Sequence, residues 1–266
     1  MESPSPDWLV YVYAITEAPV PLGSGGIDLA PIRWISEGSL SAAVSDVPMD
    51  EFDEAPLNEL IRDMAWLGPR AVAHQEVNLR LHESAQALIP LAFGTVFRHD
   101  ERVRALLRNE ASALAGRLET VRGSAEWVVA LHLLAEPDAA AVERQSPALH
   151  ALRGEIEAAP PGRAHLLRRR LAELERDEGR RVQAEAAGQV LERLRGVTRA
   201  VFAEPLPQDT VERPLLRASV LVARDKEDAF LDETERLRVT WREPTYRVLL
   251  TGPWPPYRFG GLNADG

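Results

Sequence analysis

The sequence predicts an α+β protein of two domains, with a mixed α+β domain first and a ferredoxin-like α/β sandwich second. Short apolar runs rich in β-branched and aromatic residues alternate with longer segments whose apolar residues recur every three or four positions. The chain has 266 residues, whereas a typical domain has about 100 to 150. We therefore place an N-terminal domain at residues 1–122 and a C-terminal domain at 123–266.

The composition is that of an ordinary globular chain and excludes several classes of function. Hydrophobic residues make up 45% and charged residues 27% of the sequence. The formal net charge of -10 disfavours nucleic acid as a partner. With no cysteine, the chain has no disulfide framework, thiolate zinc site or cysteine nucleophile. The first apolar run is far shorter than the roughly 20 residues of a membrane span, so we expect neither export nor a membrane span.

The N-terminal domain is expected to begin with a buried strand and to continue as a hairpin. Its predicted strands are residues 8–15, 32–35 and 40–47. Helical spacing starts at Leu57, and Pro69 is predicted to kink or restart that helix. Residues 89–97 resemble a strand, but Pro90 and Gly94 place it at an edge or a bulge. A helix capped by Asp100 then completes the domain.

The C-terminal domain alternates strands and helices. Its predicted strands are residues 126–134, 215–223 and 246–250, and a helix is expected at 226–237. A long charged helix is expected near 147–195, with Ser146 as its cap and Pro147 at its first position. This alternation predicts an open sheet with helices on one face, and we favour a ferredoxin-like version.

Three polar clusters have structural explanations. His74, Asn78 and His82 share a helical face, but the histidines lie about 12 Å apart along the axis, too far to share one ion. The acidic residues 50–54 precede a helix, where negative charge is favourable. Arg168, Arg169 and Arg170 are followed by acidic residues, so we expect a solvated face of mixed charge. No metal site is predicted.

The carboxy-terminal tail and the segment 89–97 each have two readings. Pro253, Pro255 and Pro256 cannot donate hydrogen bonds and restrict the backbone, so Trp254 and Tyr257 are held in a stiff segment. These aromatic residues either fasten the tail onto the C-terminal domain or form a partner-binding surface. Likewise, residues 89–97 either leave a strand edge open for a partner or form a bulge.

Three segments resemble the gas vesicle L/F protein family. They are YVYAI at Tyr11–Ile15, ALIPLAFGTVF at Ala87–Phe97 and LTGPWPPYRF at Leu250–Phe259. Arg258 departs from the pattern, in which a small polar residue is expected. The resemblance implies an accessory protein, in the cytoplasm or on the gas vesicle, that helps to build the gas-filled shell. Its implied partners are the small hydrophobic shell protein of the GvpA type and other accessory proteins, with no catalysis and no cofactor.

We therefore expect a protein that acts by binding, and we name six candidate contact residues. They are Pro90, Phe93, Gly94, Trp254, Tyr257 and Phe259. One alternative is a ferredoxin-like regulatory protein that binds a small ligand. The other is an enzyme, for which no constellation of titratable residues, phosphate-binding loop or nucleophile motif is visible in the sequence.

Overall fold

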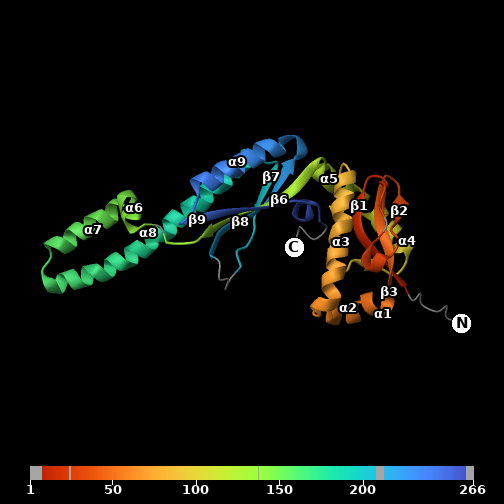
Figure 1. The fold of residues 1–266 in the computed structure, drawn as a ribbon, viewed down its shortest axis with the longest axis horizontal. Coiled ribbons are helices and arrows are strands. Elements are labelled where there is room, and N and C mark those ends of the chain that lie inside the picture. Colours follow the sequence, from red (N-terminus) through yellow and green to blue (C-terminus); the bar gives the residue numbers. More distant parts are fainter. Residues whose placement is uncertain (1–7, 24, 137, 208–212, 262–266) are drawn as a thin grey trace. The chain divides into compact units, whose positions relative to one another are not determined.

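The protein has a mixed α+β fold with two antiparallel sheets, confirming the predicted class (Figure 1). A computed structural model describes residues 8–23, 25–136, 138–207 and 213–261. The chain forms two compact units, the first from residues 1–126 with 252–266 and the second from residues 127–251. No helix in the described part of the chain is both long enough and apolar enough to cross a membrane.

The sheet of the first unit is organised around its first strand. Its strands are β1 (Trp8–Thr16), β2 (Arg33–Glu37), β3 (Leu40–Pro48), β4 (Ile89–Pro90) and β5 (Val96–Phe97). β1 pairs with β3 on one side and with the short β4 and β5 on the other. The predicted hairpin is present as β2 and β3, and Gly38 takes the positive φ of 58° that its tight turn requires. Residues 89–97 lie at a sheet edge, as predicted.

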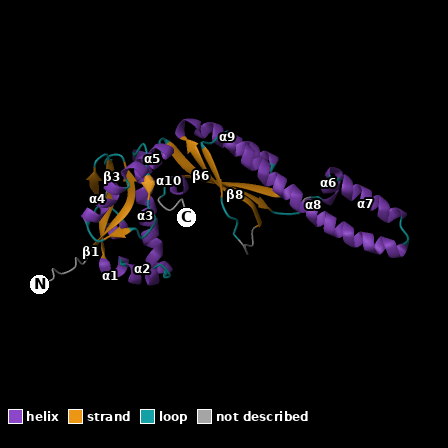
Figure 2. Ribbon diagram, turned by 180° about the vertical axis from the view of Figure 1, so that it is seen from behind, coloured by secondary structure: helices purple, strands orange, loops and turns teal. Residues whose placement is uncertain are grey.

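Helices cover both faces of this sheet. They are α1 (Met49–Phe52), α2 (Glu54–Leu60), α3 (Met64–Ser84), α4 (Asp100–Asn109) and α5 (Ala111–Val121). Residues of α4 and α5 share one apolar cluster with Val10 and Val12, whereas residues of α3 share the other with Tyr11 and Tyr13. Figure 2 shows the strands of this unit between α4 and α3. β1 is therefore buried on both faces, which explains its unbroken apolar sequence.

The helix break in the first unit is not at Pro69. Asp63 caps α3, because its side chain accepts a hydrogen bond from the backbone N–H of Ala65 at 2.9 Å. α3 then continues through Pro69, so a restart at that proline was the wrong prediction. Asp53 caps α2 in the same way, which agrees with a structural role for the acidic residues 50–54.

The second unit holds a four-stranded sheet with helices packed on it. Its strands are β6 (Ser124–Leu133), β7 (Ala200–Ala203), β8 (Arg213–Ala223) and β9 (Tyr246–Trp254), in the spatial order β7-β8-β6-β9. The ring of Trp127 on β6 packs against Phe230 of α9 (Glu227–Thr240), with ring centroids 5.6 Å apart. The strand β7 is absent from the sequence-based prediction, because it is only four residues long and follows a helix closely.

The predicted long helix at 147–195 is instead a helical hairpin. α7 (Pro147–Ala158) is followed by α8 (Pro161–Arg195), and the short α6 (Ala139–Gln145) precedes them. Pro160 disfavours helical dihedrals in Ala159 before it, so the chain turns there, and Pro161 then starts α8. Ser146 caps α7 as predicted, with its Oγ accepting from Leu149 N at 3.3 Å. α7 lies beside the first part of α8 (Figure 1).

The aromatic tail lies in the first unit and not in the C-terminal domain where we predicted it. Residues from Gly252 onward cluster with residues 1–126, and α10 (Tyr257–Gly260) contacts α5 and β4. Pro255 and Pro256 are buried, so apolar burial holds the tail there. The chain passes into the second unit within β6 and returns within β9. Residues 262–266 and Ser24 of the Gly-rich loop lie outside the described residues.

Substitution of Phe230 tests the packing of the core of the second unit. Its side chain is fully buried against Trp127, so Phe230→Ala is expected to lower the free energy of unfolding by about 3 to 5 kcal/mol. Leu231→Ala is the matched control, because Leu231 is the next residue of the same helix and is exposed. Urea denaturation followed by circular dichroism measures both, and equal losses would contradict the assigned packing of α9.

Candidate functional site

The segments Tyr11–Ile15 and Ala87–Phe97, together with residues 252–259 of the third segment, lie in the first unit. Residues 89–97 run along β1, where Leu91 N donates to Tyr13 O and Val12 N donates to Thr95 O, each at 2.9 Å. The tail helix α10 contacts β4 within that segment. Segments that are far apart in the sequence therefore form one site around β1, β4 and α3.

Two buried tyrosines of β1 organise the polar groups of this site. The Tyr11 hydroxyl accepts a hydrogen bond from Gly94 N at 3.1 Å and lies 2.8 Å from His74 Nδ1. The Tyr13 hydroxyl accepts from Ile27 N at 2.9 Å and lies 2.7 Å from Ser45 Oγ. Burial raises the pKa of both tyrosines, so both phenols are neutral at physiological pH. Each hydroxyl thus fixes a loop against the sheet.

His74 is a neutral histidine of the core. Its Nδ1 contacts the Tyr11 hydroxyl, its Nε2 lies 3.0 Å from Asn78 Nδ2, and the residue is only 5% exposed. Burial lowers the pKa of His74 from its ordinary value of 6.5 to about 4. Within the described residues, no three His, Asp or Glu side chains are close enough to hold a metal ion. The helical face of His74, Asn78 and His82 is a structural network.

Hydrogen bonds between described residues fasten the tail to the first unit. The Tyr257 hydroxyl donates to Gln75 Oε1 at 2.7 Å, and Arg258 N donates to Glu126 Oε2 at 2.7 Å. Arg117 Nη1 donates to the carbonyl of Gly261 at 2.6 Å. Burial raises the pKa of Tyr257 to about 12, so its hydroxyl stays a donor. The tail is therefore held by α3, α5 and β6.

Apolar packing completes this attachment. Phe259 packs against the core cluster that includes residues of β1, α4 and α5. Gly260 lies so close to the unit that a Cβ atom there would sit 3.3 Å from the Leu88 carbonyl oxygen and 3.4 Å from Val121 Cγ1. Tyr257 and Phe259 fasten the tail, as one of the two readings proposed for Tyr257, but they fasten it to the first unit.

The structure brings most of the six candidate contact residues together but encloses several of them. Pro90 is buried, and Gly94 has a φ of 84° with Leu57 Cδ2 only 2.9 Å from where its Cβ would stand. Phe93 is half-buried, with its ring 5.8 Å from that of His74. Trp254 is also half-buried, and it makes no hydrogen bond or ring contact with the described residues.

Sequence reasoning did not identify the groups that receive the tail. Gln75, Arg117 and Glu126 all bind it, yet no sequence motif marks any of them as a receiver of the tail. Gln75 directly follows His74 in the same helix, which is the one local signal that the sequence offers. These three residues contact the tail because residues 252–261 return to the first unit in the folded protein.

The buried histidine predicts a specific pH dependence. Because the pKa of His74 is about 4 in the folded chain and 6.5 in the unfolded chain, the unfolded state binds the proton first as the pH falls. The stabilisation is fully present above about pH 7.5, and this group alone is expected to lower the free energy of unfolding by about 2 to 3 kcal/mol by about pH 4.5.

The measurement compares the parent with His74→Gln, which has no titrating ring. The difference in free energy of unfolding between the two proteins is expected to be largest at neutral pH and to shrink as the solution is acidified. Urea titrations at several pH values give this difference. Two stability profiles that run parallel over the whole range would contradict a depressed pKa at His74.

Comparison with known proteins agrees with this arrangement. A family described as "Gas vesicle synthesis protein GvpL/GvpF" matches residues 9–260. Gas vesicle protein L of Streptomyces sp. (strain CB03234) is 34% identical over 273 aligned residues, covering 97% of this chain and 95% of that protein. Gas vesicle protein F of the same strain is 29% identical, covering 94% of this chain and 98% of that protein.

Solved structures share the fold. The crystal structure of gas vesicle protein GvpF from Microcystis aeruginosa matches with a TM-score of 0.68 at 18% identity, covering 95% of this chain and 98% of that one. The GvpF structure from Anabaena sp. PCC7120 gives a TM-score of 0.70 at 15% identity with the same coverage. The chain, which matches this family from β1 to α10, therefore belongs to the GvpL/GvpF family of gas vesicle proteins and has a role in gas vesicle formation.

Proposed function

We propose that the protein is an accessory factor that binds the hydrophobic shell subunit and other vesicle proteins while the gas vesicle is assembled. It works at the vesicle or in the cytoplasm around it. Family membership supports the role in vesicle formation. Binding of the shell subunit is our own proposal, because an apolar subunit needs its surface covered until it joins the wall.

The proposed contact surface is based on the position of Trp254. Pro253 and Pro255 flank it, so its backbone is restricted before any partner arrives. Its side chain is half-buried and without a hydrogen-bonded or ring partner in the described part of the chain. Tryptophan is enriched among the residues that dominate binding energy, because it buries a large apolar area at little entropic cost. Phe93 belongs to the same proposed surface.

The other candidate residues serve this surface indirectly in our proposal. Tyr257 and Phe259 attach the tail to the first unit, and this attachment fixes the position of Trp254 a few residues earlier. Pro90 and Gly94 shape the segment that carries Phe93. We propose that none of these residues takes part in catalysis, because the most perturbed titratable groups, Tyr11 and His74, are enclosed in the core.

The architecture of the second unit supports a ferredoxin-like assignment. Its elements run strand, helices, strand, strand, helix, strand, and its sheet order is β7-β8-β6-β9. The ligand-binding alternative has one feature in its favour, a groove of about 480 Å³ between α6, α7 and α8. Two of its arginines, Arg180 and Arg213, already pair with Asp177 and Glu136. Because that charge is compensated, we prefer the adapter function.

Substitution of Trp254 tests the proposed surface. The shell subunit is co-expressed with the tagged protein, and the amount recovered with the tag is measured by quantitative mass spectrometry. Trp254→Ala is expected to reduce the apparent affinity about tenfold or more, as loss of a dominant interface residue does. Leu249→Ala is the control, because Leu249 is an exposed apolar residue of the same strand β9 and is not one of the candidate contact residues.

The result for Trp254→Ala tests the contact surface, and the result for the parent tests the adapter function. If folded Trp254→Ala recovers the shell subunit as well as the parent does, the tail is not the contact surface. If the parent recovers no vesicle protein at all, the adapter function is wrong. A thermal shift with anionic metabolites then tests the ligand-binding alternative.

A further inference from the structure

The start of α8, at the tip of the helical hairpin in the second unit, carries four arginines, and the exposed carboxylates of Glu155, Glu157 and Glu173 lie on the same hairpin. Arg163, Arg168, Arg169 and Arg170 are exposed, and none of them forms an ion pair with the described residues. Of the acidic residues that follow, Glu173 is exposed and forms no ion pair with the described residues, whereas the next three are paired. Glu175 binds Arg153 at 2.8 Å, Asp177 binds Arg180, and Glu178 binds Arg181 at 2.8 Å. These arginines lie on a solvated face of mixed charge, as expected, but other arginines take most of the nearby carboxylates as ion-pair partners.

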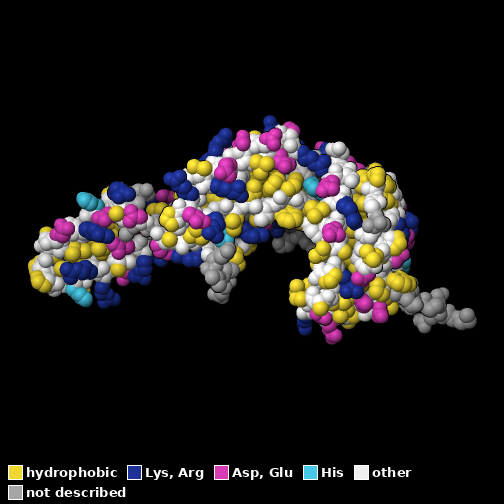
Figure 3. All heavy atoms as spheres, in the orientation of Figure 1, with side chains coloured by type: hydrophobic (Ala, Val, Ile, Leu, Met, Phe, Trp, Pro, Cys, Tyr) yellow, Lys and Arg dark blue, Asp and Glu magenta, His cyan; other side chains and the backbone are white. Residues whose placement is uncertain are grey.

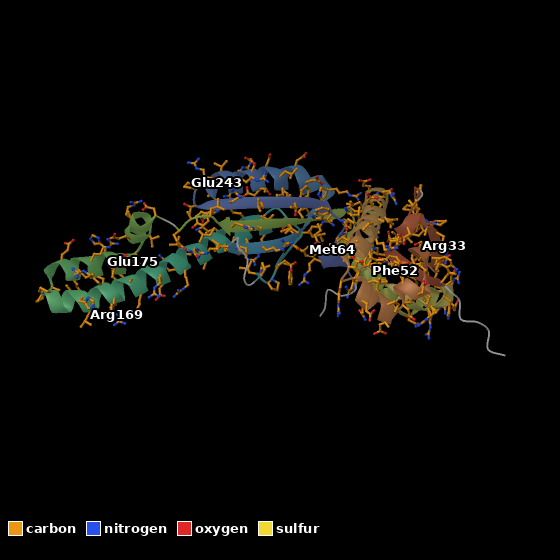
Figure 4. All side chains as sticks on the ribbon, turned by 60° about the horizontal axis from the view of Figure 1, so that its bottom comes forward. Arg33, Phe52, Met64, Arg169, Glu175 and Glu243 are labelled. Atoms are coloured by element: carbon orange, nitrogen blue, oxygen red, sulfur yellow. The ribbon has the colours of Figure 1, made fainter. Side chains whose placement is uncertain are left out.

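An exposed apolar side chain lies among these arginines. Leu166 is 66% exposed and stands one helical turn from Arg163, Arg169 and Arg170. Figure 4 shows Arg169 on the outer side of α8, whereas Glu175 lies toward α7. We call Leu166 with the four unpaired arginines the basic tip. It is a cationic surface with an apolar centre in a protein whose net charge is -10.

The first unit carries a surface of the opposite kind. Asp50, Glu54 and Glu59 are exposed and form no ion pair within the described residues, whereas their neighbours Glu51 and Asp53 bind Arg70 and Arg98. Met64, which is 71% exposed, and Ile61 lie beside them in sequence at the start of α3. Figure 3 shows apolar and acidic side chains together at this end of the unit. We call these five residues, Asp50, Glu54, Glu59, Ile61 and Met64, the acidic face.

We propose that the basic tip of one copy of this protein binds the acidic face of a second copy. The surfaces are complementary in charge, and each has an exposed apolar side chain that the contact would cover. A net charge of -10 makes two copies repel each other in most orientations. Two copies attract each other when the basic tip of one faces the acidic face of the other. The charges therefore select this orientation of the contact.

The proposed contact joins two different surfaces and is therefore head to tail. Each copy keeps a free basic tip or a free acidic face after one contact has formed, so association continues into short chains unless it closes into a ring. Exposed ion pairs are weak, at about 0 to 1 kcal/mol each, and are screened by salt. Self-association is thus expected at low ionic strength and lost at about 0.5 M NaCl.

A charge-swap experiment on the full chain tests the proposal. The tip variant carries Arg168→Glu, Arg169→Glu and Arg170→Glu, and the face variant carries Glu54→Lys and Glu59→Lys. Each variant alone is expected to self-associate at least about tenfold more weakly than the parent in sedimentation velocity at low salt. A mixture of the two variants is expected to associate again, because the acidic tip of one meets the basic face of the other.

The control variant changes the net charge by the same amount as the face variant does, but at another place on the surface. Asp228→Lys with Asp232→Lys changes two exposed residues four positions apart on α9. This variant is expected to associate as the parent does. If its altered net charge weakens self-association, the loss is expected to be smaller than the loss in the face variant. Circular dichroism confirms that every variant is folded. A chain that carries both the tip and the face changes is expected to regain self-association.

Three results would overturn the proposal. The parent could stay monomeric at every concentration at low salt. The tip and face variants could associate as strongly as the parent. Their mixture could also remain monomeric while the parent associates, which would place the contact elsewhere. Binding of polyglutamate to the tip of a monomeric parent would assign the basic tip to another acidic protein instead.

Discussion

The burial of β1 on both faces is the constraint on which the first unit depends. From Leu9 to Thr16 no residue of the strand is exposed to solvent. A strand enclosed in this way can carry polar groups only if each finds a partner, because an unpaired buried hydroxyl costs roughly 1 to 3 kcal/mol. Tyr11 and Tyr13 therefore dictate the positions of the Gly94 and Ile27 backbone and of His74. The segment 89–97 is irregular for this reason.

Elements with strong local patterns could be predicted from the sequence, and elements that depend on distant contacts could not. The apolar runs of β1, β3, β6 and β8 were long enough to identify as strands. β7 has only four residues, so it becomes a strand only when β8 pairs with it. The turn between α7 and α8 was visible as Pro160 and Pro161, but the density of helix-forming residues around them outweighed that signal.

For the candidate site, the chemistry of single residues was predictable and their neighbours were not. The stiffness of the tail follows from Pro253, Pro255 and Pro256, whereas the receiving side chains Gln75 and Glu126 come from distant segments. The ion-pair partners on α8 show the same limit. Helical spacing pairs arginines with nearby carboxylates, but Arg153 on α7 competes for Glu175 across the hairpin. Arg153 is too far from Glu175 in the sequence for helical spacing to reveal this pair.

Because its tail returns to it, the first unit is interrupted in sequence by the whole of the second. The ribosome makes residues 127–251 before the segment that carries Phe259. The core of the first unit therefore stays incomplete until Phe259 has been synthesised. Until then, part of the surface near Leu88 and Val121 is open. A product that ends before Phe259 lacks the side chain that covers this part of the core, so its first unit is expected to be less stable than that of the full chain.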